Sequence, residues 1–138
     1  MRERAVTDVI QVAIRSDADI VMVRQQARML AKELGFSSSD LTLIATALSE
    51  LARNIVEYAQ QGEIILSQIR QGAQRGLTII AHDNGPGIAD IERAMLDGYS
   101  TGKGLGLGLP GAKRLMDEFE ITSCMGQGTT VKATKWVH

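Results

Sequence analysis

A carboxylate turn and a glycine-rich run carry the residues of this chain that are best suited to chemistry. The apolar run 77–81 leads toward Asp83, which is followed by Gly85, Pro86 and Gly87. Glycines permit a sharp turn there and let another molecule approach the backbone closely. Further along, a second set of glycines alternates with other residues ahead of a predicted helix, and these are Gly102, Gly104, Gly106 and Gly108. Exposed N–H groups at a helix start favour phosphate, so the two segments predict a nucleotide site, with the base at the turn and the phosphates at the run.

A third group of polar residues lies on the second predicted helix, which runs to about Tyr58. The apolar residues of this helix recur at helical spacing and form one stripe. With 3.6 residues per turn, the polar residues that fall together on the face opposite this stripe are Glu50, Arg53, Asn54 and Glu57. Polar groups therefore converge on one patch, although a helix face in contact with solvent explains the same pattern.

Composition excludes several classes of function. The chain has 138 residues, 44% of them hydrophobic and 22% charged, which predicts one folded domain over residues 1–138. Its 15 basic and 16 acidic residues give a net charge of -1, so we expect no nucleic-acid partner. The sequence contains neither a signal-peptide pattern nor a membrane span of about twenty apolar residues, which predicts a cytoplasmic protein with no membrane partner.

Cysteine and histidine content argues against a disulfide framework and against a metal cage. Cys124 is the single cysteine, so it cannot form an internal disulfide. The two histidines, His82 and His138, have no companion cluster at ligand spacing. We interpret His82 as a strand-end residue near the site rather than as a group with a chemical role.

Hydrophobic patterning predicts alternating groups of strands and helices. The β-branched run 4–14 favours a strand at a sheet edge. Ser16 as an N-cap and Gly35 as a terminator bound the first helix, and the loop 37–39 precedes the second. The other predicted elements are a hairpin of strands 63–70 and 76–82, a short helix 90–95, a helix 109–117, and a hairpin of strands 119–125 and 129–137.

The order of these elements defines the fold class. Pairing of the later strands as hairpins predicts an α/β (α+β) two-layer sandwich, with a mixed, mainly antiparallel sheet and helices on one face. A Rossmann fold is excluded because the glycine run does not directly follow a strand and no βαβ unit surrounds it. A P-loop is excluded because no Gly-Lys-Ser/Thr stands at the required spacing.

Taken together, four ordered motifs resemble the GHKL, or Bergerat-fold, ATPases and kinases. They are Glu50-x-x-x-Asn54, Asp83-x-Gly85-x-Gly87, Gly102-x-Gly104-x-Gly106 and Gly126-x-Gly128-Thr129. Within this superfamily, the run L-P-G-A-K-R-L-M-D-E-F at 109–119 and the run T-T-V-K-A-T-K-W that ends at Trp136 resemble the RsbT-type stressosome kinases, which are switch proteins of bacterial stress signalling.

This resemblance implies a role for each motif residue and implies ATP and Mg²⁺ as cofactors. Asp83 would accept a hydrogen bond from the adenine amino group, Gly87 would let the purine lie against the backbone, and Thr129 would support Asp83. Asn54 would place its amide oxygen on Mg²⁺, and Glu50 would take the proton from an attacking hydroxyl. The residues expected to contact the nucleotide also include Gly85 and the phosphate loop of Gly102, Lys103, Gly104, Leu105, Gly106, Leu107 and Gly108.

Some assignments in this resemblance stay open. Arg53 and Lys103 could contact phosphates or a protein partner, but solvated surface positions explain them equally well. We also expect the segment 97–106 to close over the nucleotide, because glycines give little side-chain packing to hold a loop.

Three departures from the wider superfamily narrow the expected activity. The sequence shows no phenylalanine-containing box of the histidine-kinase kind, and we expect neither a preceding helix with a phosphoacceptor histidine nor a following transducer domain. The resemblance then implies a free-standing serine/threonine kinase that phosphorylates STAS-domain antagonist or scaffold proteins and, once released, binds and activates a serine phosphatase. An anti-sigma factor that holds a sigma subunit, or a nucleotide-dependent partner switch without catalysis, are the alternatives.

Overall fold

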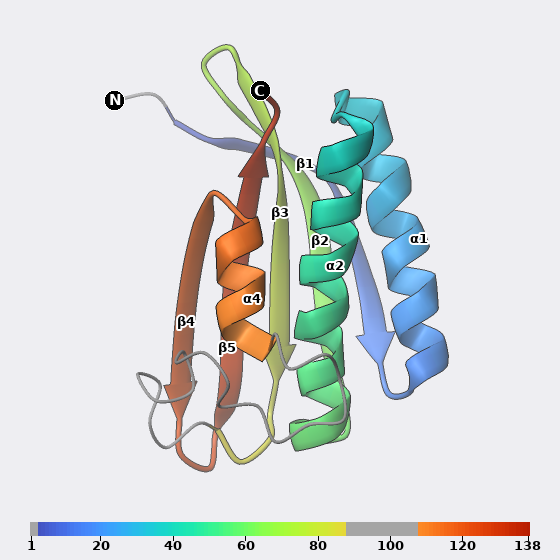
Figure 1. The fold of residues 1–138 in the computed structure, drawn as a ribbon. Helices are drawn as coiled ribbons and strands as arrows, with labels where there is room; N and C mark the ends of the chain where they lie inside the picture. The colour runs from blue at the N-terminus through green and yellow to red at the C-terminus, as the bar shows by residue number, and fades with distance from the viewer. Residues whose placement is uncertain (1–2, 88–107) are drawn as a thin grey trace.

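The computed structural model describes residues 3–87 and 108–138, and in this part of the chain helices cover one face of a sheet (Figure 1). The sheet contains β1 (Ala5–Ile14), β2 (Gly62–Gln71), β3 (Gln74–Asp83), β4 (Glu118–Cys124) and β5 (Gly128–Trp136). The helices are α1 (Asp17–Leu34), α2 (Ser38–Asn54), the π-helix η1 (Ile55–Ala59) and α4 (Gly108–Leu115). The predicted short helix 90–95 and the expected closing segment 97–106 lie outside the described residues.

The described strands form one antiparallel sheet in the order β1-β2-β3-β5-β4. This arrangement confirms the predicted two-layer sandwich, both hairpins and the position of the first strand at an edge. β3 lies at the centre, and its last residue, Asp83, pairs with Gly62 of β2 on one side and with Thr129 of β5 on the other. Asp83 is therefore held between two neighbouring strands.

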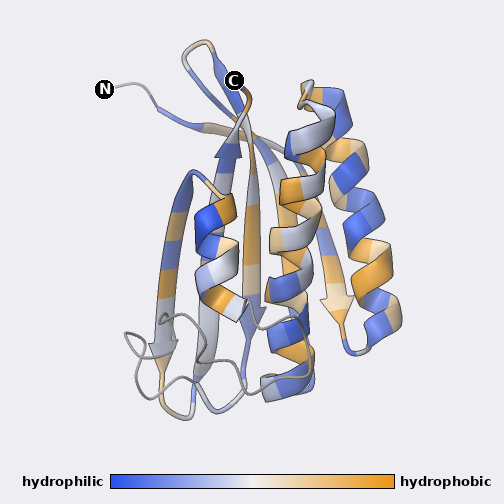
Figure 2. Ribbon diagram, viewed as in Figure 1, coloured by the Kyte–Doolittle hydropathy of each residue, from blue (hydrophilic) through white to orange (hydrophobic). Residues whose placement is uncertain are grey.

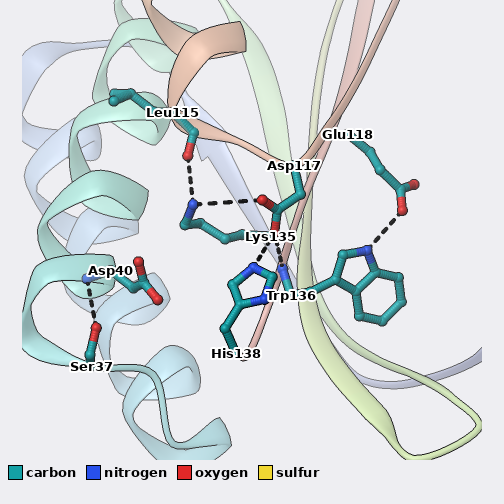
Figure 3. A network of polar contacts seen from close by, with 8 residues as sticks. All are labelled: Ser37, Asp40, Leu115, Asp117, Glu118, Lys135, Trp136 and His138. Carbon is teal, nitrogen blue, oxygen red and sulfur yellow. Dashed lines mark hydrogen bonds and ion pairs between the residues drawn. The ribbon is translucent and has the colours of Figure 1, made fainter.

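The helix boundaries follow local capping chemistry. α1 ends at Gly35, whose φ of 92° is left-handed and suits a residue without a side chain. Ser16 precedes α1 as predicted, but its side chain makes no capping bond; the Asp19 carboxylate accepts the Arg15 N–H instead, at 2.9 Å. Ser37 caps α2 by accepting the Asp40 N–H at 3.1 Å (Figure 3).

The core lies between the helices and one face of the sheet. Successive strand residues point to opposite faces, and hydrophobic and hydrophilic residues alternate accordingly along β4 (Figure 2). The central strands contribute Ile64, Leu66, Leu77 and Ile79 to this core, all of them fully buried. The apolar stripes of α1 and α2 pack onto these strand residues. The stripes include Val23 of α1 and Leu48 and Leu51 of α2. The sheet and the helices are thereby fixed relative to each other.

Polar contacts attach the C-terminal end of α4 to β5 (Figure 3). The buried Lys135 ammonium donates to the Leu115 carbonyl at 2.9 Å and lies 4.0 Å from the Asp117 carboxylate. That carboxylate accepts the Trp136 backbone N–H at 2.8 Å. α4 was predicted to reach residue 117, but it ends at Leu115, and Asp117 serves this connection instead. The connection fixes α4 against the sheet and so fixes the direction of its N-terminus.

A second cluster ties the N-terminus of the described chain to the same end of the sheet. Oε2 of Glu118 accepts hydrogen bonds from the Trp136 indole and from Arg4, both at 2.8 Å. The Arg4 guanidinium also lies 5.1 Å from the Trp136 ring centroid. Partial burial raises the pKa of Glu118, but the two hydrogen bonds and the charge of Arg4 outweigh it, so the pKa stays below its ordinary value.

We predict that this carboxylate stabilises the fold in a pH-dependent way. Because its pKa is lowered in the folded state, the stabilisation is present above the ordinary carboxyl pKa and is lost as the pH falls through the lowered value. The stability difference between wild type and Glu118→Gln, measured by urea unfolding, should be largest near neutral pH and should shrink in the acid range. Glu120→Gln, at an exposed position of the same strand, is the matched control. A difference that stays constant with pH would contradict the assignment.

Candidate nucleotide-binding site

The turn after β3 is organised by the Asp83 carboxylate. Its Oδ1 atom accepts the Gly85 N–H at 2.9 Å, an Asx turn that fixes the side chain. A Cβ atom on Gly85 would lie 2.6 Å from Cβ of Ala59, so only glycine fits beside η1. With Oδ1 engaged by the backbone, the second carboxylate oxygen of Asp83 is the acceptor available for an amino group.

The start of β5 supports the same turn from the other side. Gly128 has a φ of 103°, and a Cβ atom there would lie 2.0 Å from the Asp83 carbonyl oxygen. Thr129 is the register partner of Asp83, and its hydroxyl lies 2.9 Å from the Ser123 hydroxyl of β4. Because alternate residues share a face, Asp83, Thr129 and Ser123 all belong to the helix-covered face of the sheet. The structure thus brings Thr129 next to Asp83, where the resemblance places it.

Gly87 makes the closest approach at the end of the turn. Its φ is 80°, and a Cβ atom there would lie 2.3 Å from the Cys124 carbonyl oxygen. The Gly126 N–H also donates to the Pro86 carbonyl at 2.8 Å. These contacts join the turn after β3 to the turn between β4 and β5, so the two glycine motifs form one surface.

The end of α2 carries the predicted acid–base group, Glu50, in a buried environment. Glu50 is only 8% exposed, so it does not lie on a solvated face. The polar face of α2 was predicted from spacing along that helix alone, whereas α2 lies between α1 and α4 and is covered from several sides (Figure 1). Oε1 of Glu50 accepts a hydrogen bond from Arg53 at 2.6 Å, and this ion pair fixes the carboxylate.

Beyond Asn54 the helix changes character. The predicted helix to Tyr58 ends as an α-helix at Asn54 and continues as the π-helix η1. Asn54 and Arg53 are half-buried, whereas Glu57 on η1 is exposed. Glu57 therefore does not share the environment of Glu50, and the predicted patch of four polar groups was wrong in this respect.

Three structural elements reach the same end of the sandwich. Figure 1 shows the C-terminal end of α2, the end of β3 and the N-terminus of α4 at one end of the sheet. α4 begins at Gly108, the last residue of the predicted phosphate loop, and a helix N-terminus favours anions. The residues of that loop before Gly108, including Lys103, lie outside the described residues. The arrangement fits a ligand with an amino-bearing base at one end and phosphates at the other.

The donor set also fits a magnesium ion held mainly by phosphates. Among the described residues, no group of three His, Cys, Asp or Glu side chains could hold a metal ion alone. Mg²⁺ in nucleotide sites needs few protein oxygens, because phosphates and waters supply the others. The Asn54 amide, one helical turn after Glu50, offers one such oxygen.

His82 and the neighbouring open depression lie on the other face of the sheet. His82 Nδ1 lies 2.8 Å from the Thr130 hydroxyl, which is consistent with a strand-end residue near the site. The depression is lined by open-face residues such as Gln11, Glu63 and His82, together with Gln61 and Asn84. It does not include Asp83, Glu50 or Asn54, but Ala59 and Gly62 also line it, so it borders the Asp83 turn from the open face of the sheet.

Sequence reasoning missed the residues that pack around the turn. Ala59, Gly62 and Ser123 were not selected, yet a Cβ atom on Gly62 would lie 2.5 Å from the His82 carbonyl oxygen and 2.8 Å from Ile55 Cγ2. The one sequence signal for Gly62 was its position between the second predicted helix and the strand that follows. For Ala59 and Ser123 the sequence carried no signal, because their roles depend on contacts between distant segments.

Comparison with known proteins defines the class to which this fold and site belong. Residues 14–135 match the family described as "Histidine kinase-like ATPase domain". A solved structure of the RsbU and RsbW domains of a Mycobacterium tuberculosis protein shares the fold, with a TM-score of 0.62 and 24% identity. It covers 94% of this chain, which spans 32% of that longer one.

Curated relatives define the family more narrowly. The serine/threonine-protein kinase RsbT of Bacillus subtilis is 54% identical over 126 residues, covering 91% of this chain and 95% of RsbT. An anti-sigma F factor of Caldanaerobacter subterraneus is 32% identical and covers 78% of both chains. The chain belongs to the family of RsbT-type serine/threonine-protein kinases, within the histidine kinase-like ATPases.

We predict that Asp83→Asn weakens ATP binding by about tenfold or more. The Gly85 N–H will hold the amide oxygen of the new side chain, so the amide NH₂ will face the adenine amino group, donor against donor. Loss of a charge-assisted hydrogen bond costs roughly 1.5 to 3 kcal/mol. Titration calorimetry measures the affinity, with Asp40→Asn at the far end of α2 as the matched control. Unchanged affinity in a folded Asp83→Asn protein would remove Asp83 from the site.

Proposed function

We propose that this protein is an ATP-dependent serine/threonine kinase whose substrates are STAS-domain antagonist or scaffold proteins of a bacterial stress-signalling complex. After phosphorylation loosens that complex, the kinase is released and binds and activates a serine phosphatase. The proposal rests on membership in the RsbT-type family and on the arrangement of Glu50 in the candidate site. We further propose that the chain works in the cytoplasm as one domain over residues 1–138. In the described residues, none of the helices has the length and apolar character needed to cross a membrane.

The observation that carries the proposal is the buried carboxylate of Glu50. A side chain that is 10% exposed and ion-paired with Arg53 is held in one orientation. A protein that only senses nucleotide needs no such group near the phosphates, whereas a kinase needs a base for the incoming hydroxyl. This difference favours catalysis over a nucleotide-dependent switch without chemistry.

The residues of the site divide the work of binding and catalysis. Asp83, Gly85, Gly87 and Thr129 would hold the adenine end. Asn54 would hold Mg²⁺, and the loop that ends at Gly108 would hold the phosphates. When bound, ATP supplies the phosphoryl group and Mg²⁺ offsets its negative charge. Glu50 would orient the substrate hydroxyl and accept its proton, and Arg53 would keep the Glu50 carboxylate in place until then.

The second candidate function is that of an anti-sigma factor that holds a sigma subunit, and it is favoured by the relatives named anti-sigma F factors. The two candidates share the same site and differ in the bound protein. The test is incubation of the purified protein with labelled ATP and Mg²⁺, once with STAS-domain proteins and once with a sigma subunit. We expect label on a serine or threonine of a STAS protein, mapped by mass spectrometry. Stable capture of the sigma subunit, with no label on any STAS protein, would favour the function of an anti-sigma factor.

We predict that Glu50→Gln separates binding from catalysis. Glutamine keeps the shape of the side chain and can still accept a hydrogen bond, but it is not a usable base. ATP affinity should stay within about threefold of wild type, while the rate of phosphoryl transfer to the substrate protein should fall by about a hundredfold or more. Glu57→Gln, at the exposed position on η1, is the matched control and should keep the wild-type rate.

A different pattern is expected for Asn54→Ala, which removes a metal ligand rather than a base. Mg²⁺-dependent ATP binding and phosphoryl transfer should decline together in this variant. Both quantities are measured on one preparation, with circular dichroism as a check of the fold. A wild-type rate of phosphoryl transfer in Glu50→Gln would contradict the assignment of Glu50 as the base. It would support a nucleotide-dependent partner switch without catalysis.

A further inference from the structure

The π-helix η1 is the part of the site that no sequence motif explains. It follows Asn54 directly and spans Ile55–Ala59. π-helical turns are rare and occur frequently at functional sites. A π turn closes with an i to i+5 hydrogen bond, so it turns the residues after Asn54 away from the stripe that α2 sets. Ala59 consequently points to a place that a continued α-helix would not reach.

The end of η1 is held in an unfavourable backbone conformation. Gln60 has a φ of 69° and a ψ of -34°, and it is one of two described non-glycine residues with positive φ. Such conformations persist only where surrounding contacts impose them. The surrounding contacts in this case are those of η1 with the strand ends beside Asp83.

Both ends of η1 touch the neighbours of Asp83. At its start, Cγ2 of Ile55 would lie 2.8 Å from a Cβ atom on Gly62, which would also lie 3.1 Å from Cβ of Asp83. At its end, Ala59 lies against Gly85, where an added Cβ atom would be 2.6 Å from the Ala59 methyl. The Gly85 N–H, in turn, holds Oδ1 of Asp83. The Ala59 methyl therefore sets the position of the backbone group that orients the carboxylate.

We infer that Ala59 is a specificity-determining positioning residue of the nucleotide site. It keeps Gly85 where its N–H engages one oxygen of Asp83, so the other oxygen faces the base in a fixed direction. Adenine presents an amino donor there, whereas guanine presents a carbonyl acceptor that a carboxylate cannot bond. Ala59 acts through Gly85 and Asp83, without contact to the base. This inference rests on the proposed function, because it takes the Asp83 turn as the adenine site.

The test compares ATP and GTP affinities in the whole protein with Mg²⁺, by titration calorimetry. Ala59→Val places extra methyl groups against Gly85, so ATP affinity should fall by about tenfold or more while GTP affinity changes little. The ratio of the two affinities should then fall about tenfold. Ala45→Val is the matched control, since Ala45 is a half-buried alanine on α2, and it should keep the wild-type ratio.

Other outcomes separate this inference from the proposed function. Equal loss of ATP and GTP affinity in Ala59→Val, or a wild-type ratio, would mean that Ala59 is a packing residue only and would overturn the inference. If Ala59→Val does not fold, Ala59→Gly serves instead, because it removes the methyl group without a clash. The ratio of ATP affinity to GTP affinity should fall by about threefold or more in Ala59→Gly. An unchanged ratio would overturn the inference. A wild-type protein with no preference for ATP over GTP would overturn the adenine site itself, and the role of Ala59 with it.

Discussion

The turn after β3 depends on contacts that leave no room for side chains. Gly85 meets Ala59, Gly87 meets the Cys124 carbonyl, Gly128 meets the Asp83 carbonyl, and Gly62 meets Ile55. Interiors packed this closely transmit small displacements instead of absorbing them. The direction of the Asp83 carboxylate is therefore set by the backbone of three strands and by η1. A site that discriminates between bases by one hydrogen bond requires such fixed geometry.

The helices connect this turn to the groups proposed for catalysis. α2 and η1 form one continuous segment, so the packing of η1 on the strand ends also places Asn54 and Glu50. On the other side, Lys135 and Asp117 hold the end of α4 to β5 and thereby direct its N-terminus toward the same end of the sheet. The sheet thus supports the turn proposed to bind the base directly, and it supports the groups proposed for catalysis and phosphate binding through the two helices.

Much of the fold and part of the site could be predicted from sequence, because they depend on local patterns. β-branched runs, glycine at the end of α1 and the hairpin turns are readable within a few residues. The motif around Asp83 was equally local. A helical wheel shows which residues share a face of α2 but not that α4 packs beside it, so the burial of Glu50 could not be predicted. The π-helix and the contacts of Ala59 and Gly62 were not predicted, since they arise where segments distant in the chain meet.

We propose that one end of this sheet holds ATP, with the base at Asp83 and the phosphates near Asn54 and Glu50. A crystal structure of the protein with Mg²⁺ and a non-hydrolysable ATP analogue tests this claim most directly. We predict a hydrogen bond of about 2.7 to 3.2 Å between the adenine amino group and Asp83, and Asn54 among the magnesium ligands. A nucleotide bound at the open-face depression beside His82, or one whose base lies away from Asp83, would contradict the account.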